Sequence, residues 1–379
     1  MPLLPNQRAL FDLPDDIAYL RCAATSPLLH RARKAGERAV GLKARPWGPG
    51  WGEQGAAAVE RARELFAGLI GASAGDIALV PSASYGLSTA ANNLPVGEHR
   101  SVVVLANQFP SNIYPWRHTV QRDGGEIRTV EPVAGDWTGP VIDAIDTNTA
   151  IVALPQCHWL DGAMLDLAAV RARCRDVEAA LVLDLSQSAG VVPIDVRAID
   201  PDFAVTVAEK WLLGPVQLGF LYVSPRWQTG KPIEHSWIGR RIGDARFLHH
   251  YSDDYRDGAR RFDVGERTNI VNLSMAIEAL QQITEWGLEV IAPSINPLTE
   301  AVAENAAAHG YVVSPDGARA PHIVGLLHPR GWPSDVQQRL ERDSVLVSLR
   351  DDVLRIAPHV YNNEADVDAL MRTLRKLMG

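Results

Sequence analysis

Two ionisable residues follow short apolar runs in the middle of the chain. Lys210 lies between residues 203–207 and 219–223, both of which have the pattern of buried strands. An amine placed there loses hydration, which lowers its pKa and leaves part of it neutral and nucleophilic. Such a lysine can form a Schiff base with a carbonyl compound. The plain alternative is a surface lysine at a strand end. Asp184 ends a further apolar run about twenty-five residues upstream.

A second cluster of small polar residues follows another predicted strand. After the apolar residues 77–80 come Ser82, Ala83 and Ser84, ahead of a helix that we expect from about residue 85. Hydroxyl and free N–H groups at a helix N-terminus form an anion site. A serine there more commonly serves as an ordinary N-cap. Its place in the chain relative to the lysine and the aspartate favours a phosphate site.

Alternating strands and helices must bring these residues together. Apolar runs at residues 77–80, 102–106, 151–154 and 181–184 are separated by helical patterns. Repeated βα units predict a mostly parallel, doubly wound sheet, with ligands at the carboxyl ends of the strands. The serine turn and Asp184 each follow a strand, and we therefore expect them to converge.

The run LDLSQSAG, which contains Asp184 and Gln187, and the run AEKWL around Lys210 resemble the aminotransferase class V family of pyridoxal 5'-phosphate (PLP) enzymes. The resemblance implies that Lys210 holds PLP as a Schiff base and that Asp184 keeps its pyridine nitrogen protonated. It further implies that Gln187 hydrogen-bonds the 3'-oxygen and that the serine turn binds the phosphate. The expected substrate is an amino acid.

Two further runs resemble parts of the family's active site. In NQFPSNIYPW, Phe109 stands where many relatives have His, and it is the candidate for stacking on the cofactor ring; the alternative is a core residue. Phe can stack but cannot exchange protons, which matches kynureninase-type relatives. In PQCHWLDG, three residues compete for the neighbourhood of the 3'-oxygen, and the choice stays open between His158, Trp159 and Asp161.

The two ends of the chain add candidate substrate residues. YLRCAATSPL resembles the family's opening motif, which implies that Thr25, with Ala24 and Ser26, lines the substrate pocket; a polar turn is the alternative. VLRIAPHVYNNEADVD places Arg355 on the arginine that clamps the substrate α-carboxylate. FDVGERTN imperfectly matches the segment that reaches a neighbouring subunit's phosphate site, with Thr268 and Asn269 as candidates. A homodimer with shared sites is therefore expected.

Two departures from the family pattern affect the expected chemistry. Glu209 precedes the lysine where relatives carry His, and a carboxylate beside a phosphate would be repulsive. We therefore expect Glu209 to point elsewhere, Thr206 or a neighbouring subunit to compensate, and cofactor affinity to be lower than in relatives. The segment 345–355 is too short for the desulfurase loop and contains no Cys, which predicts no cysteine desulfurase turnover.

The predicted fold class is α/β, PLP-dependent transferase fold type I. We expect an N-terminal arm over residues 1–17, a large PLP-binding domain with a mostly parallel seven-stranded sheet over 18–262, and a small α+β domain over 263–379. The Gly-, Pro- and Trp-rich residues 44–55 are expected to form a loop over the site.

Composition excludes several classes of protein. A chain of 379 residues with 46% hydrophobic residues can bury a sizeable core, and its net charge of −8 offers no basic field for nucleic acid or anionic membranes. Three scattered cysteines do not make a disulfide framework or a zinc site. With no membrane span or signal sequence in evidence, we expect a cytoplasmic protein without a metal.

The leading functional prediction is a PLP-dependent aminotransferase. A lyase of kynureninase-like or carbon–sulfur type, or an epimerase, is the alternative within the same fold. A catalytically silent binding protein is the alternative of another class. A nucleotide-binding protein without PLP lacks support, because no strand is followed by G-x-G-x-x-G or a P-loop.

Overall fold

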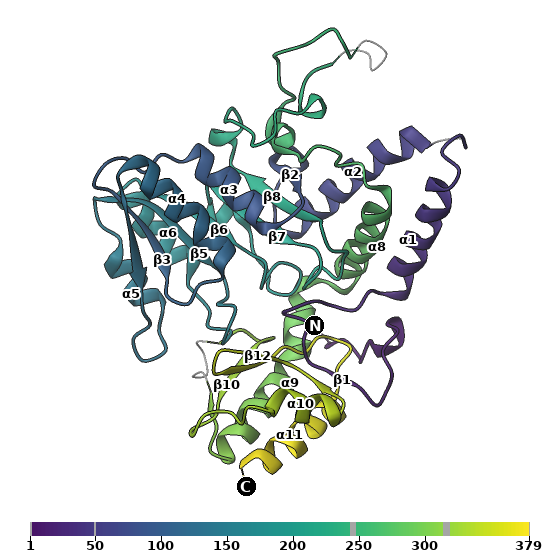
Figure 1. Cartoon of the computed structure of the whole chain (residues 1–379), viewed down its shortest axis with the longest axis vertical. Coiled ribbons are helices and arrows are strands. Elements are labelled where there is room, and N and C mark those ends of the chain that lie inside the picture. Colours follow the sequence, from purple (N-terminus) through teal and green to yellow (C-terminus); the bar gives the residue numbers. More distant parts are fainter. Residues whose placement is uncertain (1, 49–50, 243–247, 314–318, 379) are drawn as a thin grey trace.

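The computed structural model describes residues 2–48, 51–242, 248–313 and 319–378. It has a large part built on a seven-stranded sheet and a small part built on a four-stranded sheet that contains the C-terminal segments. In Figure 1 the large part occupies the upper two thirds of the view, and the small part, in yellow and green, lies below it. This matches the predicted α/β fold with a smaller α+β unit.

The large sheet is mostly parallel. Its order is β2-β8-β7-β6-β5-β3-β4, and only β8 runs antiparallel to its neighbours. The strands are β2 (Ile77–Val80), β3 (Ser101–Leu105), β4 (Glu126–Val130), β5 (Thr149–Pro155), β6 (Ala180–Asp184), β7 (Phe203–Val207) and β8 (Gly219–Val223). The predicted strands are thus present, most of them shifted by no more than a residue or two at their ends.

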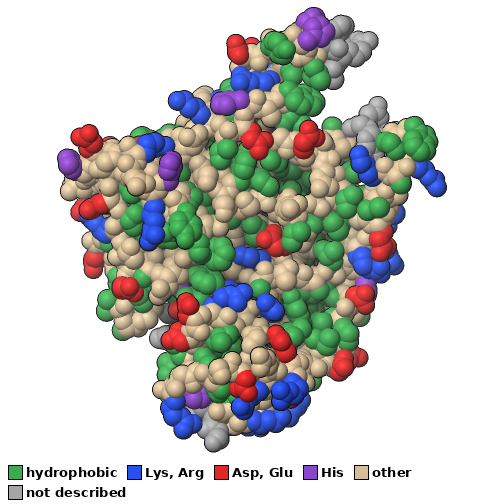
Figure 2. Space-filling view, in the orientation of Figure 1, with side chains coloured by type: hydrophobic (Ala, Val, Ile, Leu, Met, Phe, Trp, Pro, Cys, Tyr) green, Lys and Arg blue, Asp and Glu red, His purple; other side chains and the backbone are tan. Residues whose placement is uncertain are grey.

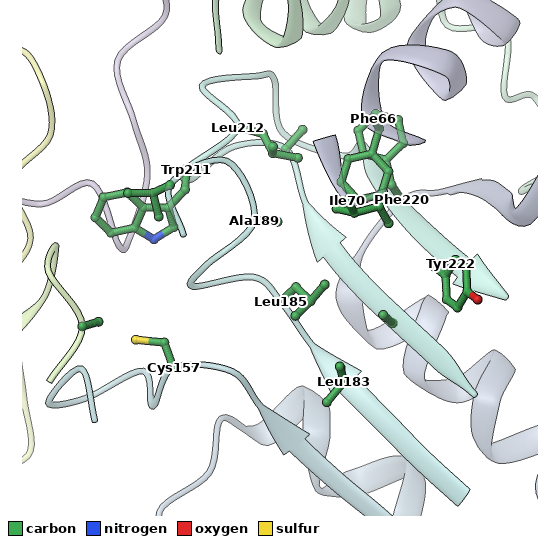
Figure 3. Packing of buried hydrophobic residues seen from close by; sticks show 14 of the residues in the cluster. Phe66, Ile70, Cys157, Leu183, Leu185, Ala189, Trp211, Leu212, Phe220 and Tyr222 are labelled. Carbon is green, nitrogen blue, oxygen red and sulfur yellow. The ribbon is translucent and has the colours of Figure 1, made fainter. Parts of the chain in front are cut away.

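Alternate residues of these strands enter two different cores. On β6, Leu181 and Leu183 belong to one buried cluster and Val182 to the other. A strand buried on both faces needs apolar residues at every position, which is why the sequence shows continuous runs. Figure 3 shows part of the larger cluster, in which the rings of Phe66 and Phe220 stack with centroids 4.4 Å apart.

Helices cover the large sheet. Those of the large part are α1 (His30–Lys43), α2 (Trp51–Leu69), α3 (Ala83–Asn93), α4 (Tyr114–Asp123), α5 (Thr138–Ala144), α6 (Leu167–Asp176), α7 (Val196–Ile199) and α8 (Ile270–Trp286). The helix α8 packs against α1 and α2. The prediction of a loop over residues 44–55 is wrong in its second half, because α2 already begins at Trp51.

The small part combines strands from both ends of the chain. The antiparallel sheet has the order β12-β13-β10-β9, with β9 (Val312–Val313), β10 (Val324–Leu327), β12 (Ser348–Arg350) and β13 (Val353–Ile356). Beside it, β1 (Ala18–Tyr19) pairs in parallel with β11 (Val345–Leu346). The helices are α9 (Leu288–Ala308), α10 (Val336–Arg342) and α11 (Glu364–Met378). The division at residue 263 stays a prediction, although the packing of α8 favours a boundary after that helix.

Candidate active site

The carboxyl ends of β5, β6 and β7 open into a pocket of about 300 Å³. Lys210, three residues after β7, lines it together with Asp184, the last residue of β6. Burial lowers the pKa of the Lys210 amine, although Asp184 and Glu209 oppose that shift through their charges. The two residues that the sequence singled out therefore lie in one pocket, and the lysine has the electrostatics of a nucleophile.

A tightly packed loop after β6 borders the pocket. Gln187 lines the pocket, and its side chain is fixed at both ends: Nε2 donates to the Ala23 carbonyl at 3.0 Å, and Oε1 accepts from Trp211 Nε1 at 2.9 Å. Gly190 follows with φ +97, where an added Cβ would collide with the Trp211 carbonyl. The close packing of these two loops explains the small residues of the run QSAG.

The serine turn forms the N-terminus of α3. Ser82 is the N-cap, and its hydroxyl accepts from the N–H of Tyr85 at 3.2 Å. Ser84 donates its hydroxyl hydrogen to Ser111 at 2.8 Å, and all three predicted residues of the turn line the pocket. The first N–H groups of a helix have no partner within it. The structure therefore supports both readings, since Ser82 caps the helix while the turn still faces the pocket.

An aromatic wall closes one side of the pocket. The ring centroid of Phe109 lies 5.3 Å from Lys210 Nζ and 5.3 Å from the ring centroid of Trp159, which meets it edge-on. Trp159 is anchored by a hydrogen bond from Nε1 to the Asn107 carbonyl at 2.7 Å. Phe109 lies at the pocket rather than in the core, and Trp159 is the pocket-lining member of the three residues that competed for this neighbourhood.

Glu209 lines the pocket as well. Burial raises the pKa of its carboxyl, whereas the Lys210 charge lowers it. Its backbone carbonyl accepts hydrogen bonds from the N–H of Ser26 at 2.8 Å and from the Ser26 hydroxyl at 3.2 Å, which fixes the N-terminal segment beside the lysine. That the Glu209 side chain points away from the cofactor phosphate stays a prediction.

Arg355 on β13 lies behind the aromatic wall and is only 3% exposed. Its Nη1 donates to the Trp159 carbonyl at 2.7 Å, and its Nε has no hydrogen-bond partner. Burial is the main cause that lowers its pKa to about 10. A buried guanidinium with unused donors fits a carboxylate ligand, in line with the predicted clamp, although Arg355 does not itself line the pocket.

Other predicted site residues lie outside the pocket lining. Thr206 is buried, and its hydroxyl lies within hydrogen-bond distance of the Leu185 and Val207 carbonyls. His158 is buried against Trp137, with its Nδ1 3.0 Å from Asp161 Oδ1. Three further predicted residues are exposed in this single chain: Thr25, Thr268 and Asn269. Asn269 caps α8.

Besides the strand-end residues Pro155 and Val207, four pocket residues had not been singled out as site residues from the sequence. They are Gln108, Ser111, Cys157 and Ser186. Gln108 Nε2 and Ser186 Oγ are buried without a hydrogen-bond partner among the described residues. Because buried polar groups are normally satisfied, such orphans at a pocket point to a polar ligand. Gln108 and Ser111 flank Phe109 in one motif, and that proximity was the available signal.

The donor set fits PLP better than a metal. A buried amine, a strand-end carboxylate, a helix N-terminus and an aromatic ring suit a carbonyl, a pyridine nitrogen, a phosphate and a ring face, respectively. Within the described residues, no three His, Cys, Asp or Glu side chains are grouped so that they could hold a metal ion. In the same residues, no helix combines the length and the apolar character of a membrane span.

Comparisons with known proteins place the chain among related enzymes. An aminotransferase YcbU of Bacillus subtilis, described as uncharacterized, is 28% identical over 81% of this chain and 80% of its own length. A kynureninase of Burkholderia pseudomallei is 28% identical over 100% of this chain and 92% of its own. An apo cysteine desulfurase of Thermococcus onnurineus has the same fold, with a TM-score of 0.87 at 20% identity over 100% of this chain and 99% of its own.

The three names carry three different activities, so the comparisons do not distinguish among them. The model of the family "Aminotransferase class-V" matches residues 18–370, which is nearly the whole chain. It covers the lysine, the aspartate, the serine turn and the buried arginine. The chain therefore belongs to the aminotransferase class-V family of enzymes, and its cofactor is pyridoxal 5'-phosphate.

Proposed function

We propose that this enzyme is an aminotransferase that acts at the Cα of an amino acid. The observation that carries the proposal is the place of Lys210: a buried amine of lowered pKa, in one pocket with Asp184 and beside the ring of Phe109. PLP, when bound, supplies an electron sink for the bond that breaks at Cα. The residues of this chain would hold the cofactor, orient the substrate and move the proton at Cα.

Each pocket residue has one task in this proposal. Asp184 would pair with the pyridine nitrogen, the turn from Ser82 to Ser84 would bind the phosphate, and Phe109 would lie against the ring. The Lys210 amine would move the proton at Cα, since its lowered pKa leaves more of it neutral and able to accept a proton. Phe109 has no proton to exchange, which leaves the lysine as the central base.

The test begins with the purified protein and added PLP. We expect a visible absorbance band that borohydride removes, and a mass increase on the peptide that contains Lys210. Lys210→Ala should lose both. Tight, saturable PLP binding would contradict the expectation of a weakened cofactor site beside Glu209. If no band forms even with excess PLP, a binding protein without turnover replaces the enzyme.

The second stage distinguishes the reactions. An aminotransferase should convert an amino acid to its 2-oxo acid without releasing ammonia, and a second 2-oxo acid should restore the original spectrum. Ammonia release together with the 2-oxo acid would instead show a lyase. Loss of optical purity without net conversion would show an epimerase, and sulfide from cysteine would overturn the expectation of no desulfurase activity.

A lyase of kynureninase type is the second candidate. It is favoured by Phe109, which stands in the F-P-S pattern, and by the kynureninase that matches the full chain. Cleavage of kynurenine in the same assay, at a rate above that of any 2-oxo acid formation, would favour this candidate over transamination.

A further inference from the structure

Two arginines lie on one face of the small sheet, and a third is paired just beyond the end of β13. In the register of β12 and β13, Ser348 is opposite Arg355, and Arg350 is opposite Val353. Residues two apart on a strand share a face, so Arg350 and Arg355 are diagonal neighbours on the same side. Arg21 pairs in parallel with Ala357, two residues after Arg355, which adds its side chain to that face. Strand pairing alone therefore assembles the cluster.

These three arginines lack a carboxylate partner within the part of the chain that the structure describes. The Nε atoms of Arg21 and Arg355 are buried without a hydrogen-bond partner, and so is the hydroxyl of Ser348 on the same face. The Nε atoms of Arg8, Arg63 and Arg171 also lack a hydrogen-bond partner, but these buried arginines differ in having a carboxylate nearby. Each of Arg8, Arg63 and Arg171 has an aspartate within 4 Å, the usual way in which a buried guanidinium is compensated.

The cluster adjoins the pocket through the aromatic wall. Arg355 donates to the Trp159 carbonyl and lies with its guanidinium carbon 5.7 Å from that ring, and Trp159 contacts Phe109 beside Lys210. The nearby carboxylate of Asp161 is taken by the N–H of Ala163 at 3.0 Å and by His158. Figure 2 shows Lys and Arg side chains in the middle of this face of the molecule, where the large and small parts meet.

The charges of the cluster affect one another. After burial, the Arg350 charge is the next cause that lowers the pKa of Arg355, and Arg21 adds to it. Three like charges held together on a sheet repel unless an anion joins them. A single α-carboxylate can occupy one guanidinium fork in a bidentate pair. It would leave the other two arginines without a counter-charge.

We propose that Arg21 and Arg350 bind a second anionic group, on the side chain of the substrate, so that the enzyme acts on acidic amino acids. This inference rests on the proposed function for the location of the substrate, with Arg355 on the α-carboxylate. The anionic group would be a side-chain carboxylate or another negatively charged group. Ser348, with its unused hydroxyl, is available to the same anion.

The experiment measures binding to the PLP-loaded enzyme by the change in its visible spectrum and by calorimetry. The probes form matched pairs: aspartate with asparagine, glutamate with glutamine, and the non-reacting succinate with butyrate. We expect each acidic probe to bind about tenfold tighter or more than its neutral partner, since a hydrogen bond to a charged group contributes about 1.5–3 kcal/mol. High salt should reduce the difference.

Variants assign the effect to residues. Arg350→Gln and Arg21→Gln should each weaken acidic probes about tenfold and leave neutral probes within about twofold. Arg350→Lys should recover part of the loss, because it restores charge but not the bidentate fork. Arg339→Gln is the matched control: it removes the same charge from α10, where Arg339 pairs with Asp335, and it should leave the preference intact. Each variant is first checked for its PLP band and thermal unfolding.

Two outcomes overturn the proposal. Equal binding of acidic and neutral probes to the wild type is one, and equal weakening of both kinds by Arg350→Gln is the other, because it would place Arg350 on the α-carboxylate. Succinate separates this proposal from the proposed function. If succinate binds in preference to butyrate but no amino acid is transaminated, the proposed aminotransferase function is wrong and the anion site is supported. If only neutral amino acids are transaminated, the aminotransferase function is supported and the anion site is wrong.

Discussion

Two arginines, each almost completely buried, carry their charge in opposite ways. Arg63 on α2, 0% exposed, donates to both carboxylate oxygens of Asp263, at 3.0 and 2.9 Å, and also bonds the Ile77 carbonyl. Arg355 on β13 has one carbonyl partner and no carboxylate within 4 Å among the described residues, whereas the Nε atom lacks a hydrogen-bond partner in both arginines. Similar burial therefore accompanies a charge that is paired with a carboxylate, in Arg63, and a charge that has no carboxylate partner, in Arg355 beside the pocket-lining Trp159. Burial of an arginine therefore does not by itself indicate a functional residue. The absence of a carboxylate partner for a buried guanidinium does.

The largest expected effect comes from removing the structural partner. Asp263→Asn should lower the free energy of unfolding by about 3–5 kcal/mol, because it leaves Arg63 buried with its charge uncompensated. Arg267 Nε, 3.2 Å from the same carboxylate, loses its partner too. Urea unfolding of the apoprotein measures the effect. The double variant Arg63→Met/Asp263→Leu should recover much of the loss, and a change below about 1 kcal/mol in the single variant would break the comparison.

A smaller effect concerns buried histidines, which need no charged partner because they stay neutral in the folded protein. Burial lowers the pKa of His322 to about 4 and that of His359 to about 3. The unfolded chain binds these protons near pH 6.5 whereas the folded protein does not, so stability is complete above that pH and falls as the pH decreases toward 4. Each histidine should cost about 1.4 kcal/mol per pH unit within this window.

Urea unfolding between pH 7 and pH 4.5 measures that slope. His322→Gln should make it shallower, whereas His118→Gln, which removes an exposed histidine from α4, should not change it. A slope that is the same in the wild type and in His322→Gln would mean that the buried ring is charged in the folded protein. In that case His322 could no longer be contrasted, as a neutral buried group, with the ion-paired Arg63.

The smallest expected effect on stability is at the functional arginine. Arg355→Met should change the free energy of unfolding of the apoprotein by less than about 1 kcal/mol, because the charge it removes was never compensated. The same variant should weaken the binding of every amino acid about tenfold or more. A large loss of stability with unchanged binding would show that Arg355 belongs with Arg63, as a structural residue.

Local patterns were sufficient to predict the strands of the large sheet and the convergence of Asp184 with the serine turn. Both depend on runs of apolar residues and on the rule that parallel strands present their carboxyl ends at one edge. The contact of the Glu209 carbonyl with Ser26 was not predictable, because it joins segments that lie far apart in the chain.

The arginine cluster could not be predicted for a related reason. Its geometry depends on the register between β12 and β13 and on the pairing of Arg21 with Ala357, which joins the two ends of the chain. A one-residue shift in either register would place a side chain on the other face. The beginning of α2 was missed because Gly and Trp residues have weak helix propensity and gave no helical signal there.

The pairing of β1 with β11 has a consequence for the order of events during synthesis. The segment that leads from β1 to Ala24, at the rim of the pocket, can take its place only after strands near the other end of the chain have left the ribosome. Contacts between distant segments form late, because closing a long stretch of chain costs entropy before the contacts themselves contribute favourable free energy. The large sheet can fold while the chain is still growing. A nascent or truncated chain would therefore have the lysine without its covering segment, and would bind cofactor in an open, water-filled pocket.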